Sequence, residues 1–178
     1  DDEALIDIKK INEELNGRLP EDDVNRGVNW QVKKFEFDNM FSYGEGNIVD
    51  FTKLNGIVGL FAPNAQGKSS LLDTLSFCLF DRSSRAYKAI NVLNNKKDWF
   101  KCKATLEVEG VEYFIERDAK RQSNGHVKVN VEFYTFADDG EKVSMNGDQR
   151  RTTQLNIRKV IGDFEDFVLT SMSSQNDS

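Results

Sequence analysis

Apolar and polar residues alternate along several stretches of the chain after residue 29, a pattern typical of strands with one buried face. The alternation predicts six strands, in the segments "WQVKKFEF", "NIVDF", "KATLEVEG", "VEYFIERDAK", "HVKVNVEFYTF" and "EKVSM". Glu109-Gly110 separates the third strand from the fourth, and Asp138-Asp139-Gly140 separates the fifth from the sixth. Because these residues favour tight turns, the last four strands are expected to form two hairpins.

Other apolar runs predict a buried strand and helices. The continuous run "GIVGLF", residues 56–61, predicts a short buried strand. The segment from Ser69 to Phe80 predicts a helix, since five apolar residues fall on one face. These residues are Leu71, Leu72, Leu75, Cys78 and Leu79. A second helix is expected from Arg151 to Ile161, with Gly162 closing it, and "FEDFVLT" predicts a short helix or turn.

The N-terminal segment, residues 1–27, differs from the rest. Asp1 to Gly17 predicts a helix with acidic residues at its N-terminal end, where they suit the helix dipole. Its apolar stripe consists of Leu5, Ile8, Ile11 and Leu15. This stripe could pack on its own domain or dock on another chain, and the sequence leaves both open. Residues 19–27, "LPEDDVNRG", are polar with Pro and Gly and indicate a linker.

Composition narrows the class of protein. The chain has 178 residues, 38% hydrophobic and 30% charged, which fits one globular domain with an appendage. No apolar run approaches the roughly 18 residues that span a bilayer. The chain starts at Asp1 without a signal-peptide pattern, and we interpret it as a piece of a longer protein. Cys78 and Cys102 are too few for a disulfide framework, and we expect buried free thiols in a reducing compartment.

The candidate chemistry lies between the buried strand and the first strong helix. Residues Ala62 to Ser69, "APNAQGKS", match the phosphate-loop pattern G-x-x-x-x-G-K-[ST] except for the alanine at its first position. Such a loop binds phosphate through inward-pointing backbone N–H groups and the positive end of the following helix. Ala62 and Ala65 are expected at negative φ, because a positive φ strains alanine. The predicted nucleotide-binding residues are Pro63, Asn64, Ala65, Gln66, Gly67, Lys68, Ser69 and Ser70.

The residue types in this pattern each have a chemical reason. Gly67 lets the backbone approach a phosphate without a Cβ in the way. Lys68 would reach the β- and γ-phosphates of ATP, and the Ser69 hydroxyl would ligate Mg²⁺. Two rival hypotheses stay open: a kinase of a small metabolite, although the sequence shows no Arg-rich lid and "DRSSRAYK" could only be mistaken for one, and a non-catalytic interaction module with a degenerate loop.

Other candidate sites are weaker. Net charge is −6, so the chain as a whole does not favour nucleic acid. Lys120, Arg121 and Lys128 near a turn could contact DNA phosphates, although a solvated hairpin explains them as well. His126 is the single histidine and cannot make a metal centre, so a solvated turn is expected there.

The ordered segments "FDNMFSYGEGNIVDF", "LFAPNAQGKSSLLDTLSFCLF", "DRSSRAYKAINVLNN" and "SSQND" resemble a known family over residues 30–178. The chain resembles the N-terminal half of the ATPase subunit of SbcC/Rad-type DNA-repair exonuclease complexes, including bacteriophage counterparts, within the SMC-like branch of ABC-class ATPases. The resemblance implies an α/β P-loop NTPase fold, an N-lobe with a mixed sheet around the P-loop helix and an adjacent antiparallel β-layer. Residues 28–178 would be this half-head, and residues 1–27 would be extra to the family.

The resemblance also implies roles and departures. Gln175 matches the Q-loop glutamine, which contacts Mg²⁺ and helps to place the attacking water. Phe41 stands where an arginine often precedes the serine matched by Ser42, and Ala62 and Ala65 replace usual glycines. Because Phe41 has no guanidinium group, an arginine contact from the segment "FDNMFSYGEGNIVDF" to the nucleotide is not expected.

An ABC-class site also needs a Walker B Asp-Glu and a signature loop, and the sequence shows neither. Asp138 and Asp139 follow apolar residues, but Gly140 indicates a hairpin turn, and "SMNGDQRR" only faintly resembles a signature loop. Alone, the chain is expected to bind ATP weakly and hydrolyse it slowly or not at all. The implied partners are a C-terminal half of the same head, a second head in a homodimer, an SbcD/Mre-type nuclease and double-stranded DNA, in the cytoplasm at the nucleoid and without a membrane.

Overall fold

The structure is a computed structural model that describes residues 29–61, 67–86 and 88–171. The predicted N-terminal helix, its linker, residues Pro63 to Gln66 with the expected φ of Ala62 and Ala65, and Gln175 lie outside the described residues. The division into residues 1–27 and 28–178 therefore stays a prediction.

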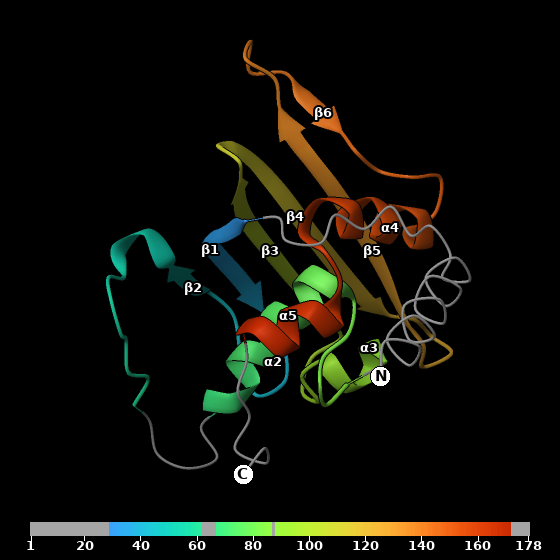
Figure 1. Cartoon of the computed structure of the whole chain (residues 1–178). Helices are drawn as coiled ribbons and strands as arrows, with labels where there is room; N and C mark the ends of the chain where they lie inside the picture. The colour runs from blue at the N-terminus through green and yellow to red at the C-terminus, as the bar shows by residue number, and fades with distance from the viewer. Residues whose placement is uncertain (1–28, 62–66, 87, 172–178) are drawn as a thin grey trace, which may run out of the picture.

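The described residues form a six-stranded antiparallel sheet with strand order β2-β1-β3-β4-β5-β6 (Figure 1). The strands are β1 Trp30–Asp38, β2 Asn47–Asp50, β3 Trp99–Val108, β4 Val111–Arg121, β5 Val127–Phe136 and β6 Lys142–Ser144. Glu109 and Gly110 join β3 to β4 with φ of 51° and 84°, as a two-residue hairpin turn requires. Gly140 has φ 83° in the β5–β6 turn, so both predicted hairpins are confirmed.

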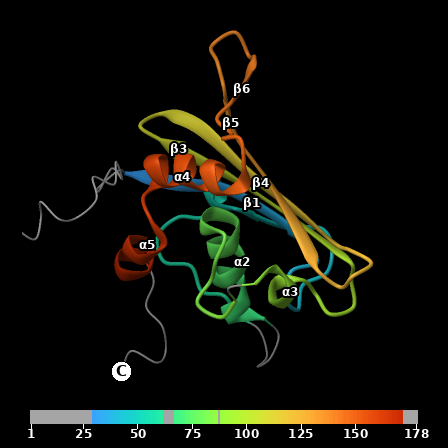
Figure 2. The same ribbon diagram turned by 90° about the vertical axis from the view of Figure 1, so that its right-hand side faces the viewer.

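One face of the sheet carries the core. Successive strand residues point to opposite faces, so alternate positions of β1, β3, β4 and β5 are buried together. These side chains include Phe35, Phe37, Phe100, Cys102, Ala104, Leu106, Ile115, Ala119 and Phe133. Figure 2 shows α2 (Lys68–Phe80), α3 (Ala89–Val92) and α5 (Phe164–Ser171) on the same side of the sheet.

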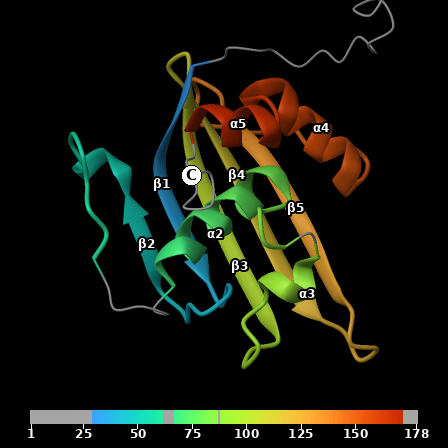
Figure 3. The same cartoon turned by 60° about the horizontal axis from the view of Figure 1, so that its bottom comes forward.

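Helix α2 crosses the buried face of the sheet (Figure 3). Its bounds confirm the predicted helix, and Leu75, Cys78 and Leu79 are buried as expected. Leu72 is 47% exposed, so its assignment to the buried face was wrong. Phe77 is buried instead and packs edge-on against Phe100, because other elements cover the C-terminal half of α2 on every side.

The expected buried strand at residues 56–61 is wrong. None of these residues belongs to a strand, and the side chains of Ile57 and Phe61 are 104% and 93% exposed. A continuous apolar run indicates a strand only if neighbouring strands and covering side chains are present. In the described part of the chain, no strand pairs with this segment. All neighbouring strands of the described sheet pair antiparallel, and residues 56–61 add no strand to it.

The C-terminal end of α2 is fixed by a buried cation from β4. Arg117 is 1% exposed, and its Nε donates to the carbonyl oxygen of Cys78 at 2.7 Å. Its Nη2 donates to the carbonyl oxygen of Leu79 and to the side chain of Gln154. Asp81 lies 3.6 Å from Nη1 and also binds Arg150. These contacts satisfy carbonyls that every helix leaves unpaired at its end, and burial lowers the pKa of Arg117.

Helices α4 (Arg150–Ile161) and α5 confirm the last predicted elements. Gly162 has φ 81° at the C-cap of α4. A capping box of Gln149 and Thr152 begins the helix. The short helix α3 and the three-residue 3₁₀ helix η1 (Phe51–Lys53) were not predicted.

An aromatic cluster joins α5 to β1 and α2. The indole Nε1 of Trp30 donates to the carbonyl oxygen of Ile161 at 2.8 Å. The Trp30 ring stacks on Phe167 at 5.8 Å, and Phe80 contacts both Phe167 and Phe164. The start of β1 and the last described helix are therefore packed into one unit.

Cys78 and Cys102 are both buried and free, as expected. Burial raises the pKa of the Cys102 thiol well above its usual value, and its contact with Cys78 acts in the same direction. A buried thiol with a raised pKa, as at Cys102, is a weak nucleophile. In the described ranges, no helix has the length and apolarity needed to cross a membrane.

Candidate nucleotide-binding site

The N-terminus of α2 has the geometry of an anion site. Gly67 is the N-cap residue, with φ 87° and ψ 11°, and as a glycine it supplies no capping side chain. The first turn holds no acidic residue. No carboxylate of this turn therefore neutralises the positive end of the helix dipole. Of the eight predicted loop residues, the structure describes Gly67, Lys68, Ser69 and Ser70, and it places them at this helix start.

Gly67 is required here for two physical reasons. Its φ of 87° is in the left-handed region, which residues with a Cβ rarely adopt. A Cβ at Gly67 would lie 2.6 Å from the Oγ of Ser42, closer than any real Cβ contact. The sequence argument assigned Gly67 to a close approach by phosphate, and the structure adds a close approach by the β1–β2 turn.

The β1–β2 turn, residues 39–46, is the part of the site that sequence reasoning missed. The Tyr43 hydroxyl donates to the carbonyl oxygen of Gly67 at 2.8 Å. Burial raises the pKa of Tyr43, so the hydroxyl keeps its proton. The segment "FSYGEG" had drawn attention only as part of the family resemblance, and no periodicity or spacing could have paired Tyr43 with a loop 24 residues away.

A cavity of about 520 Å³ opens beside this turn. Phe41 and Ser42 line it from the turn, and Asn91 of α3 and residues 93–96 after this helix line it from the other side. Phe41 has φ 50°, in the left-handed region, and replaces the arginine that the resembled family often has. An aromatic ring and carboxamide groups at the wall of a cavity can contact a nucleoside by stacking and hydrogen bonds.

The segment after α2 is held against the helix. Asp73 in α2 is buried, accepts from the Ser84 hydroxyl at 2.8 Å and lies 3.3 Å from Nε of Arg85. Arg82 forms an ion pair with Glu165 at 2.7 Å and lies over the ring of Phe164. Both arginines of "DRSSRAYK" thus contact neighbouring elements, which does not favour the mobile lid that a kinase would need.

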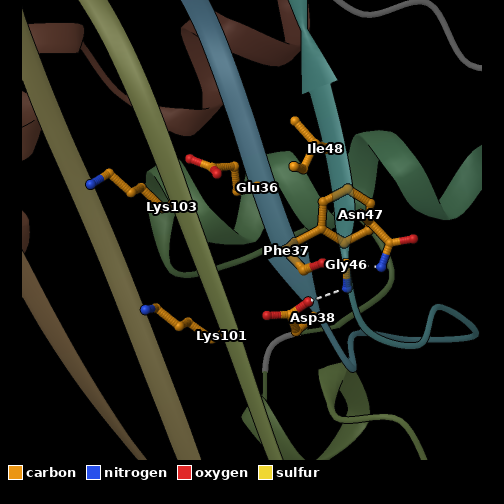
Figure 4. Close-up of a pocket in the computed structure, with 8 residues that line it drawn as sticks. All are labelled: Glu36, Phe37, Asp38, Gly46, Asn47, Ile48, Lys101 and Lys103. Carbon is orange, nitrogen blue, oxygen red and sulfur yellow. Dashed lines mark hydrogen bonds between the residues drawn. The ribbon is translucent and has the colours of Figure 1, made fainter.

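A second cavity, of about 300 Å³, lies on the opposite face of the sheet (Figure 4). Glu36 and Asp38 of β1 line it opposite Lys103 and Lys101 of β3, and Asp38 Oδ1 accepts from the Gly46 N–H. Two carboxylates offset the two ammonium groups, so the cavity has no net attraction for a phosphate.

The remaining sequence candidates are surface features. Asp138 and Asp139 lie in the exposed β5–β6 turn, which agrees with a hairpin rather than a Walker B strand. His126 is exposed beside the β4–β5 turn, and no metal-binding cluster of acidic, His or Cys residues occurs in the described ranges. Arg121 pairs with Asp98 at 3.4 Å. DNA binding by Lys120, Arg121 and Lys128 stays a prediction.

The antiparallel sheet and the helix that starts at Gly67 agree with the N-terminal region of a P-loop ATPase head of the SMC-like, ABC class, which the following comparisons identify. Residues 34–177 match the family model AAA_23, described as AAA domain, and the chain belongs to this family. The resemblance stated from the sequence and the predicted fold class are thereby confirmed.

Two curated relatives show what the chain is similar to. It is 37% identical over 153 residues to Uncharacterized protein R555 of Acanthamoeba polyphaga mimivirus, and the match covers 82% of this chain and 11% of that protein. It is 25% identical over 129 residues to SbcC, a subunit of the SbcCD nuclease of Bacillus subtilis (strain 168), and this match covers 69% of this chain and 11% of that protein.

A solved structure supports the fold. It is the recombination mediator protein RecF-ATP of the RecFOR pathway, with a TM-score of 0.50 and 22% identity. The match covers 72% of this chain and 31% of that chain. This chain therefore spans about a tenth of the two curated relatives and about a third of the solved one.

Proposed function

We propose that this chain is the ATP-binding half of the head of a DNA-repair or recombination ATPase. The observation that carries the proposal is Gly67, held at φ 87° as the N-cap of α2 and followed by Lys68 and Ser69. A helix N-terminus of this kind binds phosphate through its N–H groups and dipole. The similarity to SbcC, a nuclease subunit, and to RecF of Thermoanaerobacter sp. (strain X514), a DNA replication and repair protein, supports a role in DNA repair.

Each site residue has a proposed role. Lys68 would contact the β- and γ-phosphates, and residues Asn64 to Ser70 would supply backbone N–H groups, whereas Pro63 belongs to the loop without an N–H of its own. The residue types fit Mg²⁺ as well as ATP, because Ser69 is exposed at the start of α2 and Gln175 offers a second oxygen ligand. The metal would neutralise charge on the phosphates during transfer. The nucleoside would enter the cavity beside Phe41 and Ser42.

The proposal also includes a C-terminal half of the head, which would bind next to this chain. The exposed apolar side chains of Ile57, Val58, Leu60 and Phe61 form a surface that a C-terminal half would cover. That half would bring the Walker B and signature residues, and ATP would join two heads in a homodimer. Head engagement would gate access of double-stranded DNA to an SbcD/Mre-type nuclease in the cytoplasm, at the nucleoid. Completed in this way the protein would hydrolyse ATP, whereas this chain alone would hydrolyse it slowly or not at all.

The experiment measures the affinity for Mg-ATP by calorimetry in wild type and in Lys68→Ala. A charge-assisted contact of roughly 1.5–3 kcal/mol predicts about a 10- to 100-fold weaker Kd for the variant. The control is Lys159→Ala, which removes the same charge from an exposed position of α4 and should leave Kd unchanged.

Three outcomes would contradict the proposal. Equal affinity of wild type and Lys68→Ala would favour a degenerate interaction module. Phosphoryl transfer from ATP to a small acceptor would favour a metabolite kinase. Robust ATP turnover by this chain alone, lost in Lys68→Ala, would refute the need for a second half.

A further inference from the structure

We infer that Tyr43 is a positioning residue of the phosphate loop, which fixes the peptide between Gly67 and Lys68 through its hydroxyl. The inference rests on the proposed nucleotide binding and adds a residue to it. Two donors converge on the Gly67 carbonyl oxygen: the Tyr43 hydroxyl at 2.8 Å and the Ser70 N–H at 2.9 Å. Both lone pairs of that oxygen are then used.

Because the peptide between Gly67 and Lys68 is rigid, the contact with the Gly67 carbonyl also fixes the direction of the Lys68 N–H. A trans peptide is planar, so its C=O and N–H point in opposite directions, and the described residues contain no cis peptide. With the Gly67 carbonyl directed toward Tyr43 and Ser70, the Lys68 N–H points away from them, out of the helix N-terminus. Glycine by itself would allow this peptide to rotate, since it populates positive and negative φ about equally.

Tyr43 can hold the peptide because its own turn is fixed. The turn contains two non-glycine residues in the left-handed region, Asn39 with φ 55° and Phe41 with φ 50°. Such residues cost energy and persist only where surrounding contacts determine them. Here the Phe41 N–H donates to the carbonyl of Val92, and the Asn94 side chain donates to the carbonyl of Tyr43 at 2.9 Å.

The ring of Tyr43 is fixed as well as its backbone. It packs edge-on against Phe37 of β1, with the ring centroids 5.0 Å apart and the planes at 88°. Phe37 is 3% exposed and belongs to the core. The hydroxyl is therefore carried on a side chain with little freedom, and the sheet core reaches the phosphate loop through Phe37, Tyr43 and Gly67.

The test is Tyr43→Phe, which removes the hydroxyl and keeps the ring. We expect the Kd for Mg-ATP to weaken about 5- to 10-fold, and amide exchange at Ser70, whose N–H donates to the Gly67 carbonyl, to become faster. The matched control is Tyr134→Phe, which removes a hydroxyl that donates to Glu116 on the opposite face of the sheet. The control should leave Kd and exchange at residues 67–70 unchanged. Kd is measured well below the melting temperature of every variant, so a loss of stability alone does not alter it.

The outcomes separate this inference from the proposed function. Weaker binding in both Lys68→Ala and Tyr43→Phe supports both. Weaker binding in Lys68→Ala with wild-type Kd and exchange in Tyr43→Phe overturns the positioning role and leaves the nucleotide site in place. Unchanged binding in Lys68→Ala removes the nucleotide site itself. A lower melting temperature for Tyr43→Phe, without a change in Kd or in exchange, shows a purely structural contact and also overturns the inference.

Discussion

The two ends of α2 lie in opposite environments. Around its C-terminal end, residues 73–80 are buried, and Arg117 binds the last carbonyls. At its N-terminal end, Gly67 carries no capping side chain, and the preceding residues Ile57 to Phe61 expose their apolar side chains. At the C-terminal end, residues of this chain bind the last carbonyls of the helix. The N-terminal end starts at a glycine without a capping side chain, next to an exposed apolar segment, and both are accessible to a ligand or a partner.

This difference indicates that the buried C-terminal end of α2 serves the stability of the fold and that its exposed N-terminal end serves binding. The buried end anchors α2 to the sheet and α4, and the exposed end begins at a left-handed glycine that supplies no capping side chain. The comparison predicts that substitutions at the buried end change the free energy of unfolding, and that substitutions at the exposed end change binding.

Arg117→Ala tests the buried end and should have the largest effect. It leaves the carbonyls of Cys78 and Leu79 without their partner and Asp81 without a buried cation. We expect a loss of roughly 3–5 kcal/mol in the free energy of unfolding, measured by urea denaturation. The control is Arg121→Ala on the same strand, where the side chain is 32% exposed. There the change should be below about 1 kcal/mol, and equal effects of the two variants would contradict a special role for Arg117.

A pair of phenylalanine substitutions compares the two ends directly. Phe77 is 1% exposed and Phe61 is 93% exposed. Phe77→Ala should cost about 3 kcal/mol in the free energy of unfolding, because it leaves a cavity in the core. Phe61→Ala should change the same quantity by about 0.5 kcal/mol or less. Urea denaturation measures both, and the proposed C-terminal half should bind Phe61→Ala more weakly. Strong destabilisation by Phe61→Ala would show that this segment packs within the chain.

The outer face of the sheet should give the smallest effect, through pH. Burial raises the pKa of Glu116, but hydrogen bonds from Lys103 and Tyr134 outweigh it, and the pKa is lowered from 4.5. A lowered carboxyl pKa adds stability above about pH 4.5 that disappears as the pH falls through the lower folded value. The stability difference between wild type and Glu116→Gln, a few tenths to about 1 kcal/mol at about pH 7, should therefore shrink below about pH 4.5. Chemical denaturation at a series of pH values measures it, and a constant difference would contradict the assignment.

The parts of the fold that depend on local residues could be predicted from the sequence. The turns at Glu109-Gly110 and Gly140 defined two hairpins, and Gly162 marked the end of α4. The segment 56–61 could not be placed correctly, because an apolar run does not say which strands will cover it. At the site, the pattern identified Gly67 as the start of α2, but the contacts of Tyr43 and Arg117 depend on pairings between distant segments.

Arg117 did leave a signal in the sequence. In "VEYFIERDAK" it occupies the same alternating positions as Ile115 and Ala119, which point to the core. An arginine at a core position indicates a buried acceptor, and the carbonyls at the end of a neighbouring helix are suitable acceptors. The Tyr43 contact had no such signal, since turn residues follow no period.

The packing of Trp30 has a practical consequence. The chain contains two tryptophans, and Trp99 is 40% exposed on β3, whereas Trp30 stacks on Phe167 and donates its indole N–H to Ile161. Intrinsic fluorescence of a Trp99→Phe variant would therefore come from a single indole that touches α5. A shift of its emission to longer wavelength would show that α5 has moved away from β1. The fluorescence of this variant would therefore report movement of that helix without an added label.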